Sequence, residues 1–325
     1  MLKRYVLVIL FCVVWLIAPA LEAFACDYCI LSTGISPLDT IKGSGVRINS
    51  RYTLMDKTYK GTEEIKTAGR PKEEFWTTEI TGFFGVTEDI TLLGVVPLKK
   101  NKARGHLHVH EDGEIEVEGI KGNESGLGDI AVLGRFSMLR RHTLDSTTVV
   151  AVLAGVKLPT GSTDGRTEAG DEYLDAHMQL GTGSTDLLLG LSASHAVQRL
   201  TLMANLLGAV TTQGTSGEQE HQYGNVLNYD MGAKYRVYPG QIAPAGTQLF
   251  LAMSVNGEVR ERETNKGVED KNSGGHTAYL SPGLQLVLAQ RWVIEASYSQ
   301  AVYHNLYGAQ TGERFKTNAG VTYLF

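Results

Sequence analysis

The strongest constraint on this chain is a two-residue alternation of apolar and polar side chains, which recurs from about residue 44 to the last residue. In the final segment one face is mostly apolar and carries Phe315, Thr317, Ala319, Val321, Tyr323 and Phe325. The other face carries Arg314, Lys316, Asn318, Gly320, Thr322 and Leu324. Successive side chains of a β-strand point to opposite faces, so the pattern predicts a strand between an apolar and a polar environment.

The alternation occurs in twelve segments, which predicts an all-β chain. The segments span 44–56, 74–85, 88–99, 126–139, 146–158, 184–195, 198–211, 225–238, 247–259, 276–288, 291–303 and 313–325. Short connections alternate with long polar ones, which span 57–73, 100–125, 159–183, 212–224, 260–275 and 304–312. An even number of strands, with short turns at one end and long loops at the other, is typical of an outer-membrane barrel.

A closed sheet explains why such strands can cross a membrane. Inside hydrocarbon every backbone N–H and C=O must be paired within the protein, and a barrel achieves this because it has no edge. A soluble β-sandwich also alternates, but it has no reason to sort its loops by length. We therefore predict a transmembrane antiparallel β-barrel of about 12 strands. The segment 149–156 is apolar on both faces, which indicates a narrow, partly filled interior.

The first 25 residues have the pattern of a signal peptide. Lys3 and Arg4 precede a nearly apolar stretch over 5–19, and the sequence over 23–25 fits a small-x-small cleavage site. The alternative is a retained apolar anchor. We predict three parts: a cleaved signal peptide at 1–25, a short periplasmic or lumen-plugging segment at 26–43, and the barrel at 44–325. The formal net charge of −5 excludes a basic nucleic-acid binder.

Three short Gly-rich stretches carry a family resemblance. They are Gly126-Leu127-Gly128-Asp129-Ile130, Lys157-Leu158-Pro159-Thr160-Gly161 and Leu180-Gly181-Thr182-Gly183-Ser184-Thr185-Asp186. In order and spacing they resemble the outer-membrane transporter family named after the MetA pathway of phenol degradation. The resemblance implies a barrel with a transport role, small apolar or aromatic solutes, and no catalytic residues.

The polar strand faces are expected to line the lumen. Their charged residues are Arg47, Arg51, Glu79, Asp129, Arg135, Asp186, Asp230, Lys234, Arg236, Glu295, Arg314 and Lys316. Mixed charges of this kind could border a water-filled path and tune what passes. Alternatively they could pair across neighbouring strands and fill a closed interior, because twelve strands lie between the filled eight-strand barrels and the open porins.

Two further groups could bind metal or form a disulfide. His106, His108 and His110 share one face of an extended segment, and imidazole suits zinc, copper and nickel, although solvated loop histidines need no metal. Cys26 and Cys29 form a Cys-x-x-Cys pair without the histidine of a haem-attachment motif, so in an oxidising compartment we expect a local disulfide.

The sequence favours a channel over an enzyme. It has no Gly-x-Ser-x-Gly elbow and no His-x-Ser arrangement of the kind found in outer-membrane phospholipases. We predict passive passage of small solutes through the bacterial outer membrane, with no cofactor and no nucleic acid. The alternatives are a structural or surface-interaction barrel without transport and a membrane-embedded lipid hydrolase. Expected partners are outer-membrane lipids, the solute, and the barrel insertion machinery, since Phe325 ends the last strand like the C-terminal aromatic of other barrels.

Overall fold

A computed structural model describes residues 43–325 except 68, 110–114 and 241–245. The predicted signal peptide, nearly all of the segment 26–43, both Cys26 and Cys29, and His110 therefore lie outside the described residues. Within the described residues no helix is long and apolar enough to cross a membrane.

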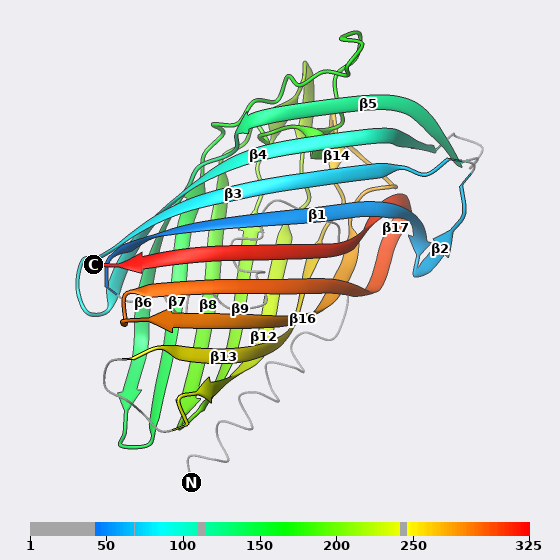
Figure 1. Ribbon diagram of the computed structural model, residues 1–325. Helices are drawn as coiled ribbons and strands as arrows, with labels where there is room; N and C mark the ends of the chain where they lie inside the picture. Colours follow the sequence, from blue (N-terminus) through cyan, green and yellow to red (C-terminus); the bar gives the residue numbers. More distant parts are fainter. Residues whose placement is uncertain (1–42, 68, 110–114, 241–245) are drawn as a thin grey trace.

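Eleven antiparallel strands form one closed sheet (Figure 1). In order around the barrel they are β1 (Gly45–Gly61), β3 (Lys72–Gly85), β4 (Ile90–Val109), β6 (Ala131–His142), β7 (Ser146–Lys157), β8 (Asp186–Val197), β9 (Leu200–Val210), β12 (Val226–Tyr238), β13 (Gln248–Arg260), β16 (Gly275–Leu288) and β17 (Trp292–Leu324). Pairing of β17 with β1 closes the ring. The predicted fold class is confirmed.

The long strand β17 spans the barrel twice. Its first part, from Trp292 to Leu306, pairs with β16, and its second part, from Leu306 to Leu324, pairs antiparallel with β1. Because Trp292 and Leu324 both lie at the end of the barrel where β1 begins, the chain must reverse between them. The eleven strands therefore make twelve passes, which matches the even number expected of such barrels.

The wall is not equally high all round. Strands β6, β7, β8 and β9 have 11 or 12 residues, whereas β1 has 17 and β4 has 20. The first part of β4 pairs with β6, and its remainder pairs with the additional strand β5 (Ile115–Leu127). The prediction of a polar loop over 100–125 was therefore wrong for most of its length. Outside the apolar band a strand needs no apolar face, so pairing continues where the sequence alternation fades.

Shorter elements cover the long-loop end. They are β2 (Glu63–Ile65), the 3-10 turn η2 (Ala176–Met178) and a four-stranded sheet of β10 (Gly214–Ser216), β11 (Gln219–Gln222), β14 (Thr264–Asn265) and β15 (Val268–Glu269). The predicted long loops 212–224 and 260–275 thus contain paired backbone.

Exposed apolar side chains cover the outside of the wall, as a lipid-facing surface requires. Leu92, Val132, Phe136, Leu187 and Leu189 are each between 44% and 51% exposed. Their neighbours along each strand are buried in the interior, in agreement with the two-residue period.

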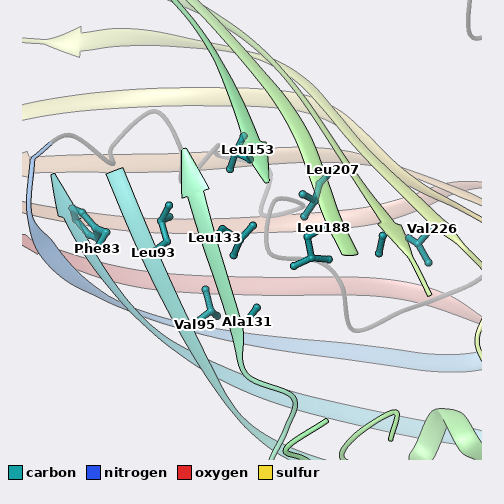
Figure 2. Packing of buried hydrophobic residues seen from close by; sticks show 10 residues of the cluster. Phe83, Leu93, Val95, Ala131, Leu133, Leu153, Leu188, Leu207 and Val226 are labelled. Atoms are coloured by element: carbon teal, nitrogen blue, oxygen red, sulfur yellow. The ribbon is translucent and has the colours of Figure 1, made fainter. Parts of the chain in front are cut away.

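A second apolar cluster lies on the inner face. It comprises Phe83, Leu93, Val95, Ala131, Leu133, Leu153, Leu188, Leu207, Ala209 and Val226, and Figure 2 shows these side chains directed into a common interior space. The cluster is carried by β3, β4, β6, β7, β8, β9 and β12. This finding explains why the segment 149–156 is apolar on both faces: one face meets lipid and the other meets the apolar cluster.

Candidate functional site

A partly open chamber of about 840 Å³ lies inside the barrel. Its wall is formed by β1, β3, β4 and β17 together with the first or last residues of β6, β7 and β8. At the long-loop end it is bordered by residues 173–179, 216–223 and 260–273. Clefts and cavities of about 300–1,000 Å³ are the usual size of small-molecule sites.

One side of the chamber is apolar. Val95, Ala131 and Leu188 belong to the inner apolar cluster and also line the chamber. Phe75 and Leu174 extend this surface toward the long-loop end. Since an apolar ring is stabilised by leaving water, this side can hold the hydrocarbon part of a solute.

Other parts of the chamber wall carry charges that are paired with one another. Lys316 Nζ lies 2.8 Å from Glu313 Oε2 and 4.5 Å above the ring of Tyr279, whose hydroxyl donates to the same carboxylate. Arg51 Nη1 lies 3.8 Å from Glu79 Oε1. All five side chains are buried. Buried charges require such partners, because moving an unpaired charge out of water costs roughly several kcal/mol of free energy.

The three Gly-rich stretches meet at one buried ion-pair site. Lys157 Nζ lies 3.0 Å from Asp129 Oδ2 and 2.7 Å from Asp186 Oδ2. The hydroxyl of Thr182 donates to Asp129 Oδ2 at 2.8 Å, and that of Ser184 donates to Asp186 Oδ1 at 2.8 Å. We call Asp129, Lys157, Thr182 and Asp186 the lysine node. It joins the ends of β6, β7 and β8 at the chamber wall.

Two glycines let the loops beside the lysine node touch backbone to backbone. A Cβ on Gly161 would lie 2.7 Å from Gly181 Cα, and a Cβ on Gly181 would lie 2.4 Å from Gly161 O. Gly161 N also donates to Asp129 Oδ1 at 2.9 Å. The glycines of the family motif therefore have a packing reason here, since any larger residue would force the two loops apart.

The segment around η2 is anchored across the chamber by backbone-directed hydrogen bonds. Gln179 Nε2 donates to the carbonyl of Leu174 at 2.7 Å and to that of Gly165 at 3.1 Å, and Gly165 N donates back to Gln179 Oε1 at 2.8 Å. Asn101 Nδ2 on β4 donates to Met178 O at 3.0 Å. The segment is thus tied both to itself and to the barrel wall.

Two histidine–glutamate pairs hold the segments at the long-loop end of the chamber in place. His177 Nε2 lies 3.2 Å from Glu73 Oε2, and His221 Nε2 lies 3.4 Å from Glu263 Oε2. Burial disfavours the charged form of His177, but the Glu73 carboxylate outweighs it and raises the pKa of His177 to about 10. Burial and Glu263 act on His221 in the same two opposing ways, and its pKa is raised. The pKa of Glu263 is lowered, because His221 and Arg260 outweigh the effect of burial.

Most of the predicted lumen charges are buried inside the barrel. They are Arg47, Arg51, Glu79, Asp129, Arg135, Asp186, Asp230, Lys234, Arg236, Glu295 and Lys316. Many of them interact across strands: Arg47 Nη2 lies 2.9 Å from Glu295 Oε2, and Gln285 bridges Glu295 at 2.9 Å and Lys234 at 3.1 Å. Only some reach the chamber, and their role along a solute path stays a prediction.

The prediction was wrong for Arg314. Its side chain is 51% exposed and pairs with Asp56 on the outside, with Nη1 3.0 Å from Oδ2. A register shift is the reason: Leu54 lies opposite Phe315, but Met55 lies opposite Glu313. The bulge leaves Arg314 unpaired in the ladder and reverses its direction, so Glu313 replaces it in the interior.

The predicted metal ligands are only partly described. His106 and His108 lie on the outer part of β4, opposite Glu118 and Glu116 of β5, and their predicted position in a loop was wrong. Among the described residues no group of three potential ligands is close enough to hold a metal ion. Because His110 lies outside that part of the chain, the histidine site stays a prediction.

Sequence analysis missed the loop residues that border the chamber, above all His177, Gln179, His221 and Glu263. They lie in the predicted long loops, where no periodicity shows which side chains turn inward. The resemblance to a known family pointed at the stretch 180–186, but it assigned no residue there a role in lining the chamber.

The comparisons with known proteins agree on the fold. A family model described as "Putative MetA-pathway of phenol degradation" matches residues 73–312. An outer-membrane channel from Pseudomonas putida F1 superposes with a TM-score of 0.63 at 12% identity, over 90% of this chain and 100% of that one. This likeness shows the outer-membrane barrel fold.

Two further solved structures superpose less closely on this chain. The transport unit of the autotransporter AIDA-I from Escherichia coli has a TM-score of 0.47 at 10% identity, over 91% of this chain and 95% of that one. The CymD monoaromatic hydrocarbon channel has a TM-score of 0.41 at 8% identity, over 88% and 90%. No curated protein matches the chain.

Proposed function

Because the chain belongs to the family described by the MetA pathway of phenol degradation, we propose that it is an outer-membrane channel for the passive passage of small apolar or aromatic solutes. The observation that carries the proposal is the partly open chamber of about 840 Å³ within a closed barrel. A barrel without a ligand role would gain stability by filling this space with side chains, since interiors normally pack without large voids.

The two-sided lining indicates which solutes the chamber can accept. Val95, Ala131 and Leu188 form an apolar surface that replaces water around a hydrocarbon ring. Elsewhere on the chamber wall, Lys316 and Glu313 offer hydrogen-bonding atoms in a pair whose charges offset each other. A phenol-like molecule satisfies both surfaces, whereas a sugar would leave its hydroxyl groups against the apolar side without partners.

Two further elements of the proposal concern the route to the membrane. Residues 1–25 act as the export signal and are removed. Phe325, which follows the last strand, is the aromatic side chain that the barrel insertion machinery recognises in this proposal. Lipids of the outer membrane cover the exposed apolar band.

Solute uptake by proteoliposomes tests the proposed function. We expect the protein to accelerate entry of a phenol-sized solute and to have little effect on a disaccharide of higher polarity. Ala131→Trp would fill the chamber from its apolar side, and we expect it to reduce phenol entry at least tenfold. Val132→Trp is the matched control, because this neighbouring side chain is 47% exposed and faces lipid.

The rates of solute uptake are compared only between preparations of folded protein. Both variants should keep β-sheet circular dichroism and the heat-dependent mobility of a closed barrel on gels. If folded wild-type protein takes up phenol no faster than empty vesicles, the proposed function is wrong. Hydrolysis of lipid esters by the same preparation would instead support the enzyme alternative, for which no residue constellation was found in the sequence.

A further inference from the structure

The outward face of β4 changes from apolar to basic at one level of the wall. Leu92 and Leu98 are exposed, and the next outward positions of the same strand are Lys100, Lys102 and Arg104. The intervening residues 99, 101 and 103 are buried in the interior. The lipid-facing band therefore ends near Leu98, on the side of the barrel that carries the long loops.

Aromatic side chains mark the same level on the neighbouring strands. Trp76 of β3 lies opposite Lys100 of β4, and its ring is 5.1 Å from that of Tyr52 on β1. Lys102 Nζ lies 5.8 Å above the Trp76 ring. Tryptophan and tyrosine favour the boundary between hydrocarbon and water, and lysine stems reach along it toward the polar side. The basic residues thus lie where lipid headgroups are.

The strand register brings like charges together beyond this boundary. Lys72 of β3, Arg104 of β4 and Lys121 of β5 lie directly opposite one another. Cβ atoms of such pairs are about 5 Å apart, and like charges there destabilise a sheet. Lys72 is offset by Glu74, whose Oε1 lies 3.0 Å away. Among the described residues neither Arg104 nor Lys121 forms an ion pair, and Glu74 interacts electrostatically with Arg104 as well as with Lys72. The row therefore sets three cations against one carboxylate, and this excess of positive charge attracts an anion from outside.

We infer that Lys72, Lys100, Lys102, Arg104 and Lys121, called the basic patch, bind the phosphate groups of a phosphorylated glycolipid in the outer leaflet. Phosphate accepts paired hydrogen bonds from the arginine fork and attracts lysine as a point charge. Clustered cations at a membrane surface bind anionic lipid headgroups. The acyl chains of such a lipid would lie along Leu92 and Leu98, which a free phosphate ion would leave uncovered.

Binding of lipid A to detergent-solubilised full-length protein tests the inference. Native mass spectrometry would compare diphosphoryl lipid A, the same glycolipid without phosphates, and inorganic phosphate alone. We expect the diphosphoryl lipid to bind most tightly, and Arg104→Gln/Lys121→Gln to weaken it by about thirtyfold, since each surface cation contributes about 1 kcal/mol. The matched control is Arg141→Gln/Arg291→Gln, which removes two exposed arginines at the short-turn end of the barrel.

The outcomes distinguish a phosphorylated glycolipid from a free phosphate ion as the bound anion. Equal binding of the two glycolipids, or equal losses in patch and control variants, would overturn the inference. Binding of inorganic phosphate as tight as that of the diphosphoryl lipid would assign the patch to a free anion and would also overturn it. Both double variants should retain barrel mobility on gels and phenol uptake, because none of the four residues lines the chamber.

Discussion

The two halves of the barrel interior are lined by different kinds of side chain. On β4, β6, β7, β8 and β9 the inner face carries most of the apolar cluster, so these strands are apolar on both faces where the cluster lies. On β1, β12, β13, β16 and β17 the inner face carries charges and amides that bond across strands. The difference shows that a barrel wall needs only its outer face to be apolar. The side chains of the inner face can therefore differ according to the solute that they contact.

Removal of a buried charge should give the largest difference between the two halves in the free energy of unfolding. In Lys157→Met the lysine node would keep two buried carboxylates without their cation, and we expect a loss of about 3–5 kcal/mol in the free energy of unfolding. In Arg47→Met the partner Glu295 still accepts from Gln285, so we expect a smaller loss of about 1–3 kcal/mol. Urea unfolding in detergent micelles measures both. Equal losses would show that the halves do not differ in this respect.

Truncation of a buried side chain should give the same ranking of the two halves. Leu153 belongs to the inner apolar cluster, and Leu153→Ala should cost about 2–5 kcal/mol through the cavity it leaves. Thr322, in the polar half, is fully buried and its hydroxyl has no hydrogen-bond partner among the described residues. Thr322→Val should therefore change stability by less than about 0.5 kcal/mol, since nothing is lost but an unpaired group. A large loss in Thr322→Val would reveal an unseen partner.

A glycine substitution tests the contact beside the lysine node. Gly161→Ala would place its Cβ 2.7 Å from Gly181 Cα, and we expect a cost of about 1–3 kcal/mol. Gly82→Ala is the control, because a Cβ there meets nothing within 4 Å. The same urea titration applies. If both substitutions are neutral, the close approach of the two loops is not required for folding.

The smallest expected effect is a pH dependence of the loop cover. The pKa of His177 is raised from 6.5 to about 10 in the folded state, so its pair with Glu73 stabilises η2 fully below pH 6.5. That contribution is lost as the pH rises toward 10. We expect proteolysis near 176–178 to accelerate over this range, and His177→Gln to abolish the dependence. A protease rate that is flat with pH in the wild type would contradict the pairing.

Strand positions were predictable because the membrane enforces them. The segment predicted at 225–238 is β12 (Val226–Tyr238), since lipid on one side and a polar interior on the other require strict alternation. The same logic failed at Arg314, where a bulge reverses the direction of a side chain without a sequence signal. It also failed beyond Leu98, where β4 leaves the membrane and continues as a strand.

The candidate site was predictable only where it lies on strands. Asp129 and Asp186 were expected in the interior and are found there, but their cation Lys157, in the strand predicted at 146–158, was not among the predicted lumen charges. His177 and Gln179 depend on how a loop of more than twenty residues folds over the barrel, and tertiary contacts with β3 and β4 decide that. A single sequence does not encode such contacts as a pattern.

The most direct test of the two-sided chamber is to locate a bound solute. Crystals of the full-length protein grown with 4-bromophenol would report the bromine position by anomalous scattering. We predict that the ring lies against Ala131 and Leu188, with its hydroxyl directed toward the charged side that holds Glu313 and Lys316. Bromine found solely in the detergent belt on the outer face, with the chamber empty, would contradict the account.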